Sequence, residues 1–192
     1  HGVPLKCEAD NRVFPESNNG GDVVGVFEQV FDDPRCQILL GHSTVKVEQL
    51  EVGFRIHFKE HPPLDVSHLV LTTGGQAYRH TGSSGDGYAF AERLGHKITP
   101  LAASLNAFVV KESWATQLAG VAWKDAGLFA EIPNGTGVRG PFLFTHQGIT
   151  GPAVFALSSL IAFETYDVSH PLTLRIDLFP ELLADQLYHR VQ

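Results

Sequence analysis

Ser67-His68-Leu69-Val70-Leu71 opens into the turn Thr72-Thr73-Gly74-Gly75, and this stretch is the most informative feature of the sequence. Residues 66–71 lack polar–apolar alternation, which predicts a strand buried on both faces, as in a parallel sheet. A second glycine turn follows at residues 82–87 and leads into a predicted helix that ends at Leu94-Gly95. Glycine lets the backbone approach a ligand closely, and free N–H groups at a helix start attract anions. The passage therefore predicts contact with a nucleotide cofactor.

The candidate cofactor contacts are polar and glycine residues of these two turns. They are Thr72, Thr73, Gly74, Gly75, Gly82, Gly85, Asp86 and Gly87. Spacing alone leaves a second interpretation, in which the glycines only make tight turns between a strand and a helix. Asp86 likewise has an alternative role as the residue that caps the helix N-terminus.

The residues before this stretch predict a hairpin, a helix and several strands. Residues 5–14 are typical of an extended hairpin turned at residues 9–11. Asp22 can cap a helix whose apolar residues recur at helical spacing and which ends at Asp33-Pro34. Three strand candidates follow, at residues 38–40, 45–48 and 54–59. The last two alternate apolar and polar residues, which predicts half-buried strands.

The pattern changes after residue 98, which predicts a domain boundary near residue 100 and hence domains at 1–100 and 101–192. Short strands with polar or glycine turns follow at residues 105–110, 118–132 and 138–144. Asn134-Gly135 is typical of a β-hairpin turn, and Gly151-Pro152 opens an apolar helix with proline at a tolerated position. A strand at 172–176 and a helix at 180–192 come last.

Composition excludes several classes of partner. The 192 residues carry a net charge of −7 without a cluster of Lys and Arg, which argues against nucleic acid as the main partner. No apolar run is long enough to span a bilayer, so no membrane partner is expected. Cys7, Cys36 and the ten histidines show no metal-ligand spacing, so we expect no metal site. Reduced thiols favour a cytoplasmic location.

Two further residues are candidates for contact with a small-molecule substrate. His146 lies where the chain leaves a strand, crosses a glycine turn and enters a helix, so its imidazole could act as an acid or a hydrogen-bond donor. The alternative is a histidine that only hydrogen-bonds its own loop. Arg12, at the edge of the predicted hairpin, could hold a substrate carboxylate, or could be a solvated surface arginine.

Four motifs follow one another along nearly the whole chain. They are Arg12-Val13-Phe14-Pro15-Glu16-Ser17, Thr72-Thr73-Gly74-Gly75-Gln76-Ala77-Tyr78, Thr81-Gly82-Ser83-Ser84-Gly85-Asp86-Gly87-Tyr88 and Leu143-Phe144-Thr145-His146-Gln147-Gly148-Ile149-Thr150-Gly151-Pro152. In this order they resemble the motifs of the BaiN/YhiN-type flavoproteins, some of which are labelled aminoacetone-oxidase-like. These proteins belong to the broad glutathione-reductase-like and fumarate-reductase-like FAD superfamily.

The resemblance implies an α/β plus α+β fold. Residues 1–100 would be the central part of an FAD/NAD(P)-binding Rossmann-like domain, with its β-meander and returning strand. Residues 101–192 would be a β-barrel-like insert domain with helices, truncated at its C-terminal end. In such folds the meander strand around Val45 often contacts the adenine end of the cofactor, and His146 would face the substrate side of the flavin.

The chain also departs from the family. No Gly-x-Gly-x-x-Gly follows an N-terminal strand, and the C-terminal segment that closes around the flavin is missing. Methionine is absent, the chain begins His1-Gly2-Val3-Pro4, and it ends inside a predicted helix. We therefore expect a fragment of a longer protein that binds FAD weakly or not at all by itself. The sequence does not indicate an oligomeric state.

The resemblance implies an FAD-dependent oxidoreductase as the parent protein. It would pass a hydride between a reduced nicotinamide cofactor (NAD(P)H), FAD and a small organic substrate of the enone or enoate type. His146 would be a polar or acid group at the substrate, and Arg12 an anchor. One alternative is a flavin-containing binding or sensor protein whose insert domain binds a ligand or partner. Another is a flavin-dependent RNA-modifying enzyme, against which the acidic balance counts.

Overall fold

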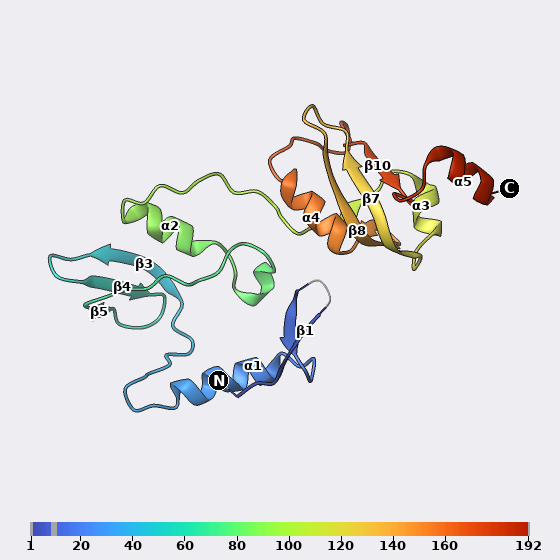
Figure 1. Ribbon diagram of the computed structural model, residues 1–192. Coiled ribbons are helices and arrows are strands. Elements are labelled where there is room, and N and C mark those ends of the chain that lie inside the picture. Colours follow the sequence, from blue (N-terminus) through green and yellow to red (C-terminus); the bar gives the residue numbers. More distant parts are fainter. Residues whose placement is uncertain (1, 9–10, 192) are drawn as a thin grey trace. The chain divides into compact units, whose positions relative to one another are not determined.

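The computed structural model describes residues 2–8 and 11–191, which form two compact units divided between Ile98 and Thr99 (Figure 1). The first unit begins with an antiparallel hairpin of β1 (Leu5–Cys7) and β2 (Val13–Pro15). The predicted hairpin is confirmed. Its predicted turn includes Ala9 and Asp10, which lie outside the described residues.

Helix α1 (Gly21–Phe31) forms where the apolar spacing predicts it and ends before Asp33-Pro34. The predicted cap is wrong, because Gly20 occupies the cap position and Asp22 lies inside the first turn. Asn19 Oδ1 accepts a hydrogen bond from the Gly21 N–H at 2.9 Å, and the Asp22 carboxylate accepts one from Ser17 Oγ. Asp22 still favours this end of the helix, where the helix dipole is positive.

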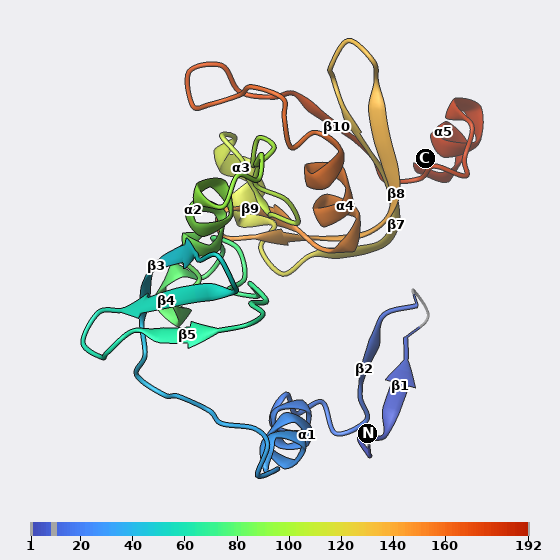
Figure 2. The same ribbon diagram turned by 90° about the vertical axis from the view of Figure 1, so that its left-hand side faces the viewer.

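A three-stranded antiparallel meander follows, made of β3 (Thr44–Gln49), β4 (Phe54–Phe58) and β5 (Leu64–Val66) in that order (Figure 2). The two predicted half-buried strands are confirmed: Val47 of β3 is buried and pairs with Ile56, and the residues of β4 are all half-buried. On the opposite face, Glu48 accepts a hydrogen bond from His57 Nε2. Apolar residues thus share one face and charged residues the other.

Two predicted strands do not form. Residues 38–40 are not a strand, and Leu40 is 84% exposed. In the second predicted strand, at residues 66–71, β5 ends at Val66 and residues 67–71 pair with no described strand. Val70 is 80% exposed, so the prediction of burial on both faces is wrong in this structure. A strand exists only through hydrogen bonds to neighbours, and no described segment runs parallel beside this one.

The two glycine turns are joined by the short 3-10 helix η1 (Arg79–Thr81) and followed by α2 (Asp86–Arg93). The predicted helix is confirmed, as is its end at Gly95, which has a φ of +90°. The alternative role of Asp86 as the cap is wrong, because Gly85 occupies that position. Phe90 is the buried residue through which α2 is anchored.

The second unit is built on one antiparallel sheet with the strand order β10-β7-β8-β9-β6. Its strands are β6 (Phe108–Val109), β7 (Ala122–Ala130), β8 (Thr136–Thr145), β9 (Gly148–Thr150) and β10 (Leu174–Asp177). The predicted hairpin turn at Asn134-Gly135 is confirmed between β7 and β8. The pairing register of β7 and β8 shifts between Trp123 and Ala126, and an irregularity of this kind bends a hairpin.

Three helices accompany this sheet: α3 (Ser113–Gln117), α4 (Pro152–Leu160) and α5 (Ala184–Val191). The predicted start of α4 at Pro152 is confirmed, whereas α3 is not anticipated by the sequence. Helix α4 packs against β7 and β8 (Figure 1). Between them lies the core, whose largest fully buried side chains are Phe142, Leu128, Ile149, Leu157, Ile161 and Val154. Their burial is the main favourable contribution to this unit.

Arg139 on β8 links two carboxylates, with Nε 2.7 Å from Asp125 Oδ1 and Nη2 2.5 Å from Glu181 Oε2. The hydrogen bonds from Arg139 hold the pKa of Asp125 below its usual value of 3.8. Such a group stabilises the fold above its unfolded pKa, and the contribution is lost as the pH falls through the folded pKa. We therefore expect wild-type melting temperature to fall below about pH 4, and Asp125→Asn to lose a small part of that dependence.

The measurement is thermal unfolding across this pH range. Asp32→Asn is the matched control, because Asp32 makes no side-chain ion pair in the described structure. Identical pH profiles for wild type and Asp125→Asn would contradict the role given to this ion pair.

Candidate functional site

The two predicted glycine turns lie against each other in the first unit. A methyl group built on Gly87 would lie 2.2 Å from Thr73 Oγ1. One built on Gly85 would lie 2.7 Å from the Gln76 side chain. Residues 72–76 therefore pack directly on the start of α2, and the absence of a side chain at Gly87 permits the approach.

Polar groups gather where these turns meet. A methyl group on Gly75 would lie 3.4 Å from the Tyr88 hydroxyl, and one on Gly74 would lie 3.6 Å from Ser83 Oγ. Within the described residues, the backbone N–H groups of residues 72–76 donate to no protein acceptor. Gly82 faces open space, with a φ of +95°. Open backbone donors beside a helix N-terminus fit an anionic group such as the diphosphate of a dinucleotide.

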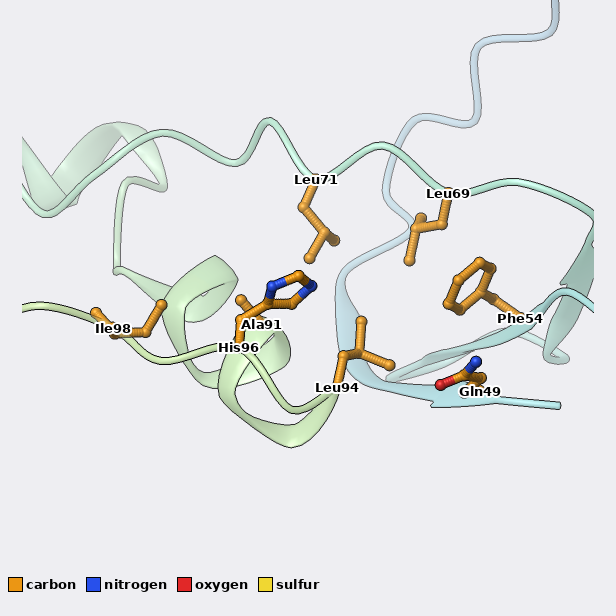
Figure 3. A pocket seen from close by; sticks show the side chains of 8 residues that line it. All are labelled: Gln49, Phe54, Leu69, Leu71, Ala91, Leu94, His96 and Ile98. Atoms are coloured by element: carbon orange, nitrogen blue, oxygen red, sulfur yellow. The ribbon is translucent and has the colours of Figure 1, made fainter.

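An open groove of about 600 Å³ lies beside Leu69 and Leu71 (Figure 3). It is lined by Gln49, Phe54, Leu69, Leu71, Ala91, Leu94, His96 and Ile98. Leu69 and Leu71 point into it, and the His96 ring lies among the apolar side chains. The groove is thus mostly apolar, with polar groups from His96 and Gln49.

His146 occupies the tight turn between β8 and β9 and is exposed. Thr145 Oγ1 holds this turn by accepting hydrogen bonds from the Gln147 and Gly148 N–H groups at 3.3 and 3.1 Å. Within the described residues, the His146 imidazole makes no hydrogen bond, ion pair or ring contact. In the described structure the imidazole therefore does not hydrogen-bond its own loop, and it is exposed.

Arg12 and Val45 are the remaining candidates. The Arg12 guanidinium lies over the Phe14 ring, 5.5 Å from its centroid, so its own hairpin orients it. Val45 is 48% exposed at the irregular start of the β3–β4 pairing. Both lie in the first unit with the glycine turns, whereas His146 lies in the second, so each is placed only within its own unit.

One feature of this site is missed by sequence reasoning. Tyr78, between the two turns, has a φ of +53°, a left-handed conformation that is unusual for a bulky residue. In a sequence, glycine or asparagine signals this conformation, so a tyrosine gives no indication of it. Among the described residues, no group of three His, Cys, Asp or Glu side chains could hold a metal ion.

Gly87→Ala is expected to destabilise the first unit by up to about 2 kcal/mol, because a collision of the new methyl group with Thr73 Oγ1 costs about 1–3 kcal/mol and the better helix propensity of alanine offsets about 1 kcal/mol. Adding Thr73→Ala should recover much of that loss, since it removes the atom that is struck. Thermal unfolding of the two single variants and the double variant measures this coupling. Strictly additive effects would show that the turns do not touch at this point.

Comparison with known proteins adds to this geometry. Residues 1–159 match the model of the HI0933-like protein Rossmann domain family. The chain is 29% identical over 180 residues to the 3-dehydro-bile acid delta(4,6)-reductase of Clostridium scindens, covering 91% of this chain and 42% of that protein. It is 36% identical over 159 residues to the ribosomal RNA dihydrouridine synthase of Escherichia coli, covering 83% and 39%.

A protein of Haemophilus influenzae, also named ribosomal RNA dihydrouridine synthase, is 28% identical over 142 residues, covering 71% of this chain and 35% of that protein. The chain thus spans about two fifths of the length of the curated relatives that it matches. No helix among the described residues has the length and apolar character needed to cross a membrane. The resemblance drawn from the four motifs is confirmed, and the chain belongs to the HI0933-like Rossmann domain family.

Proposed function

We propose that the full-length protein is an FAD-dependent oxidoreductase that passes a hydride from NAD(P)H, through FAD, to a small organic substrate. The substrate would carry a carbon–carbon double bond conjugated with a carbonyl group. The observation that carries this proposal is the pair of packed glycine turns, with open backbone donors at the start of α2. Residues 1–98 would be the central part of the FAD-binding domain and residues 99–192 most of an insert domain.

The residues of this chain would divide the work as follows. FAD, when bound, supplies the two-electron redox chemistry. The N–H groups of residues 72–76 and the N-terminus of α2 would hold its anionic groups, and Val45 would approach its adenine end. His146 would donate a hydrogen bond or a proton at the substrate carbonyl oxygen, which makes the conjugated carbon easier for a hydride to attack. Arg12 would anchor a substrate carboxylate.

The names of the relatives support this class of reaction. One is a delta(4,6)-reductase and two are dihydrouridine synthases. A reductase of conjugated double bonds is consistent with all three names. The protein would thus act on an activated double bond, with a substrate that the sequence does not identify.

An RNA uridine is the second candidate substrate. The observation that favours it is the 36% identity to the Escherichia coli protein over 83% of this chain. Against it stands the net charge of −7, because an RNA partner calls for clustered positive charge. We therefore favour a small-molecule substrate over RNA and expect no nucleic-acid partner. We also propose that the protein is cytoplasmic.

The test is the visible absorption spectrum of the purified full-length protein, beside this 192-residue chain. We expect a flavin spectrum in the full-length protein that bleaches with NAD(P)H without oxygen and returns when a conjugated enone is added. The chain alone should retain little FAD. A full-length protein without flavin, even after FAD is added, would contradict the proposal.

Two other outcomes discriminate the alternatives. Bound flavin that no acceptor reoxidises would favour a sensor or binding protein. Dihydrouridine formed in ribosomal RNA, with enones left unreduced, would favour the RNA substrate.

A further inference from the structure

Tyr78 is held in a backbone conformation that tyrosine rarely adopts. Its φ and ψ are +53° and +52°, in the left-handed region, where the Cβ atom crowds the following carbonyl group. Glycine or asparagine would meet the needs of this turn at lower cost. Strained residues of this kind persist where the surrounding structure imposes them, and they concentrate at ligand sites.

Hydrogen bonds hold the turn on both sides of Tyr78. The Tyr78 carbonyl accepts two hydrogen bonds from Thr81, one from its N–H and one from its Oγ1, both at 2.8 Å. On the other side, Arg79 Nη2 donates to Gln76 Oε1 at 2.9 Å. Gln76 in turn lies against Gly85 in the second glycine turn. The strained residue is therefore tied to both turns of the candidate site.

The tyrosine side chain makes few contacts that could offset this strain inside the described structure. It is 76% exposed. Its ring contact is with His80, edge to face, at 6.0 Å between ring centroids. An edge contact of this kind leaves most of the ring surface open. A turn that is tied in place on both sides thus presents an aromatic ring to the outside.

We propose that Tyr78 is a stacking residue for a planar conjugated ring at the redox centre. This inference rests on the proposed function, because that function places the two glycine turns at the cofactor. A flat aromatic ring gains most from an offset, stacked partner, and an exposed ring at a fixed position loses little freedom on binding. The partner ring is either the isoalloxazine of FAD or the conjugated part of the substrate.

The experiment compares three variants of the full-length protein. Tyr78→Gly removes the ring and relieves the backbone, and Tyr78→Phe keeps the ring. Leu105→Gly is the matched control, because Leu105 is also left-handed, with a φ of +57°, and 67% exposed, but belongs to the second unit, whereas the glycine turns belong to the first. The readouts are melting temperature, FAD affinity with quenching of flavin fluorescence, and KM for an enone.

Both glycine variants are expected to raise the melting temperature, because each relieves a left-handed side chain. Tyr78→Gly should also weaken binding of the partner ring about tenfold. A loss of FAD affinity with recovered flavin fluorescence identifies the flavin as that ring. A raised KM with unchanged FAD affinity identifies the substrate. Tyr78→Phe should keep wild-type values in both measurements.

Unchanged FAD affinity, fluorescence and KM in Tyr78→Gly would overturn this inference while leaving the proposed function intact. So would equal losses in Leu105→Gly, because these would indicate a general effect. A wild-type protein that binds no flavin would instead overturn the proposed function itself. If Tyr78→Gly does not fold, Tyr78→Asn gives the same comparison, since asparagine tolerates the left-handed region and has no ring.

Discussion

His146→Ala in the full-length protein is expected to lower the rate of substrate reduction by about 10²- to 10⁴-fold, the usual contribution of a general acid. The imidazole is exposed on the β8–β9 turn and makes no hydrogen bond, ion pair or ring contact within the described residues, so its removal should affect the chemistry more than the fold. The loss of rate should fall on the second half-reaction, in which the substrate reoxidises the flavin. Flavin reduction by NAD(P)H should keep its wild-type rate, and reoxidation by the enone should slow. Rapid-mixing absorbance at the flavin band separates these two steps.

Gln147→Ala is the matched control for His146, because both residues lie in the same two-residue turn. Its side chain makes no described contact, and the turn keeps its hydrogen bonds to Thr145 Oγ1. We expect near wild-type rates in this control and unchanged flavin content in both variants. Wild-type reoxidation in His146→Ala would remove His146 from the reaction.

Gly148→Ala is expected to destabilise the second unit by about 3 kcal/mol or more, since it combines a steric collision with backbone strain. A methyl group at Gly148 would lie 2.1 Å from the Phe108 carbonyl oxygen and 2.8 Å from the Val110 nitrogen. Both atoms are backbone, so no side-chain rotation relieves the collision. Strand β6 must therefore move away from β9, and the hydrogen bond from the Val110 N–H to the Gln147 carbonyl is lost.

Thermal or urea unfolding measures this loss. Gly25→Ala in α1 is the control, because a methyl group there would meet nothing within 4 Å. In a helix interior this change should be neutral or stabilising by up to about 1 kcal/mol. A Gly148→Ala variant as stable as wild type would show that β6 does not pair with β9 as described.

Local patterns along the chain predict much of the fold. Alternation places β3 and β4 correctly, because period-two burial depends only on which face of a strand meets the core. The Asn134-Gly135 turn and the proline at the start of α4 are also local signals, since each acts through its own backbone angles. The order of four motifs is sufficient to identify the family.

Long-range contacts escape this reasoning. Apolarity at residues 38–40 and 66–71 predicts strands, but a strand also needs a hydrogen-bonding neighbour, and none of the described segments supplies one to residues 38–40 or 67–71. Helix α3 is five residues long, too short for a periodic pattern to reveal. The left-handed Tyr78 depends on Thr81 and on the neighbouring turn, which its own residue type does not indicate.

For the candidate site, the residue types can be read from the sequence: two glycine turns, a helix start, and a histidine in a motif of its own. The contact between the turns through Thr73 and Gly87, and the open N–H groups of residues 72–76, become visible only in the folded molecule. A glycine permits close contact with its backbone, but its residue type does not indicate which segment makes that contact. The contact partner depends on how the turns pack in the folded molecule.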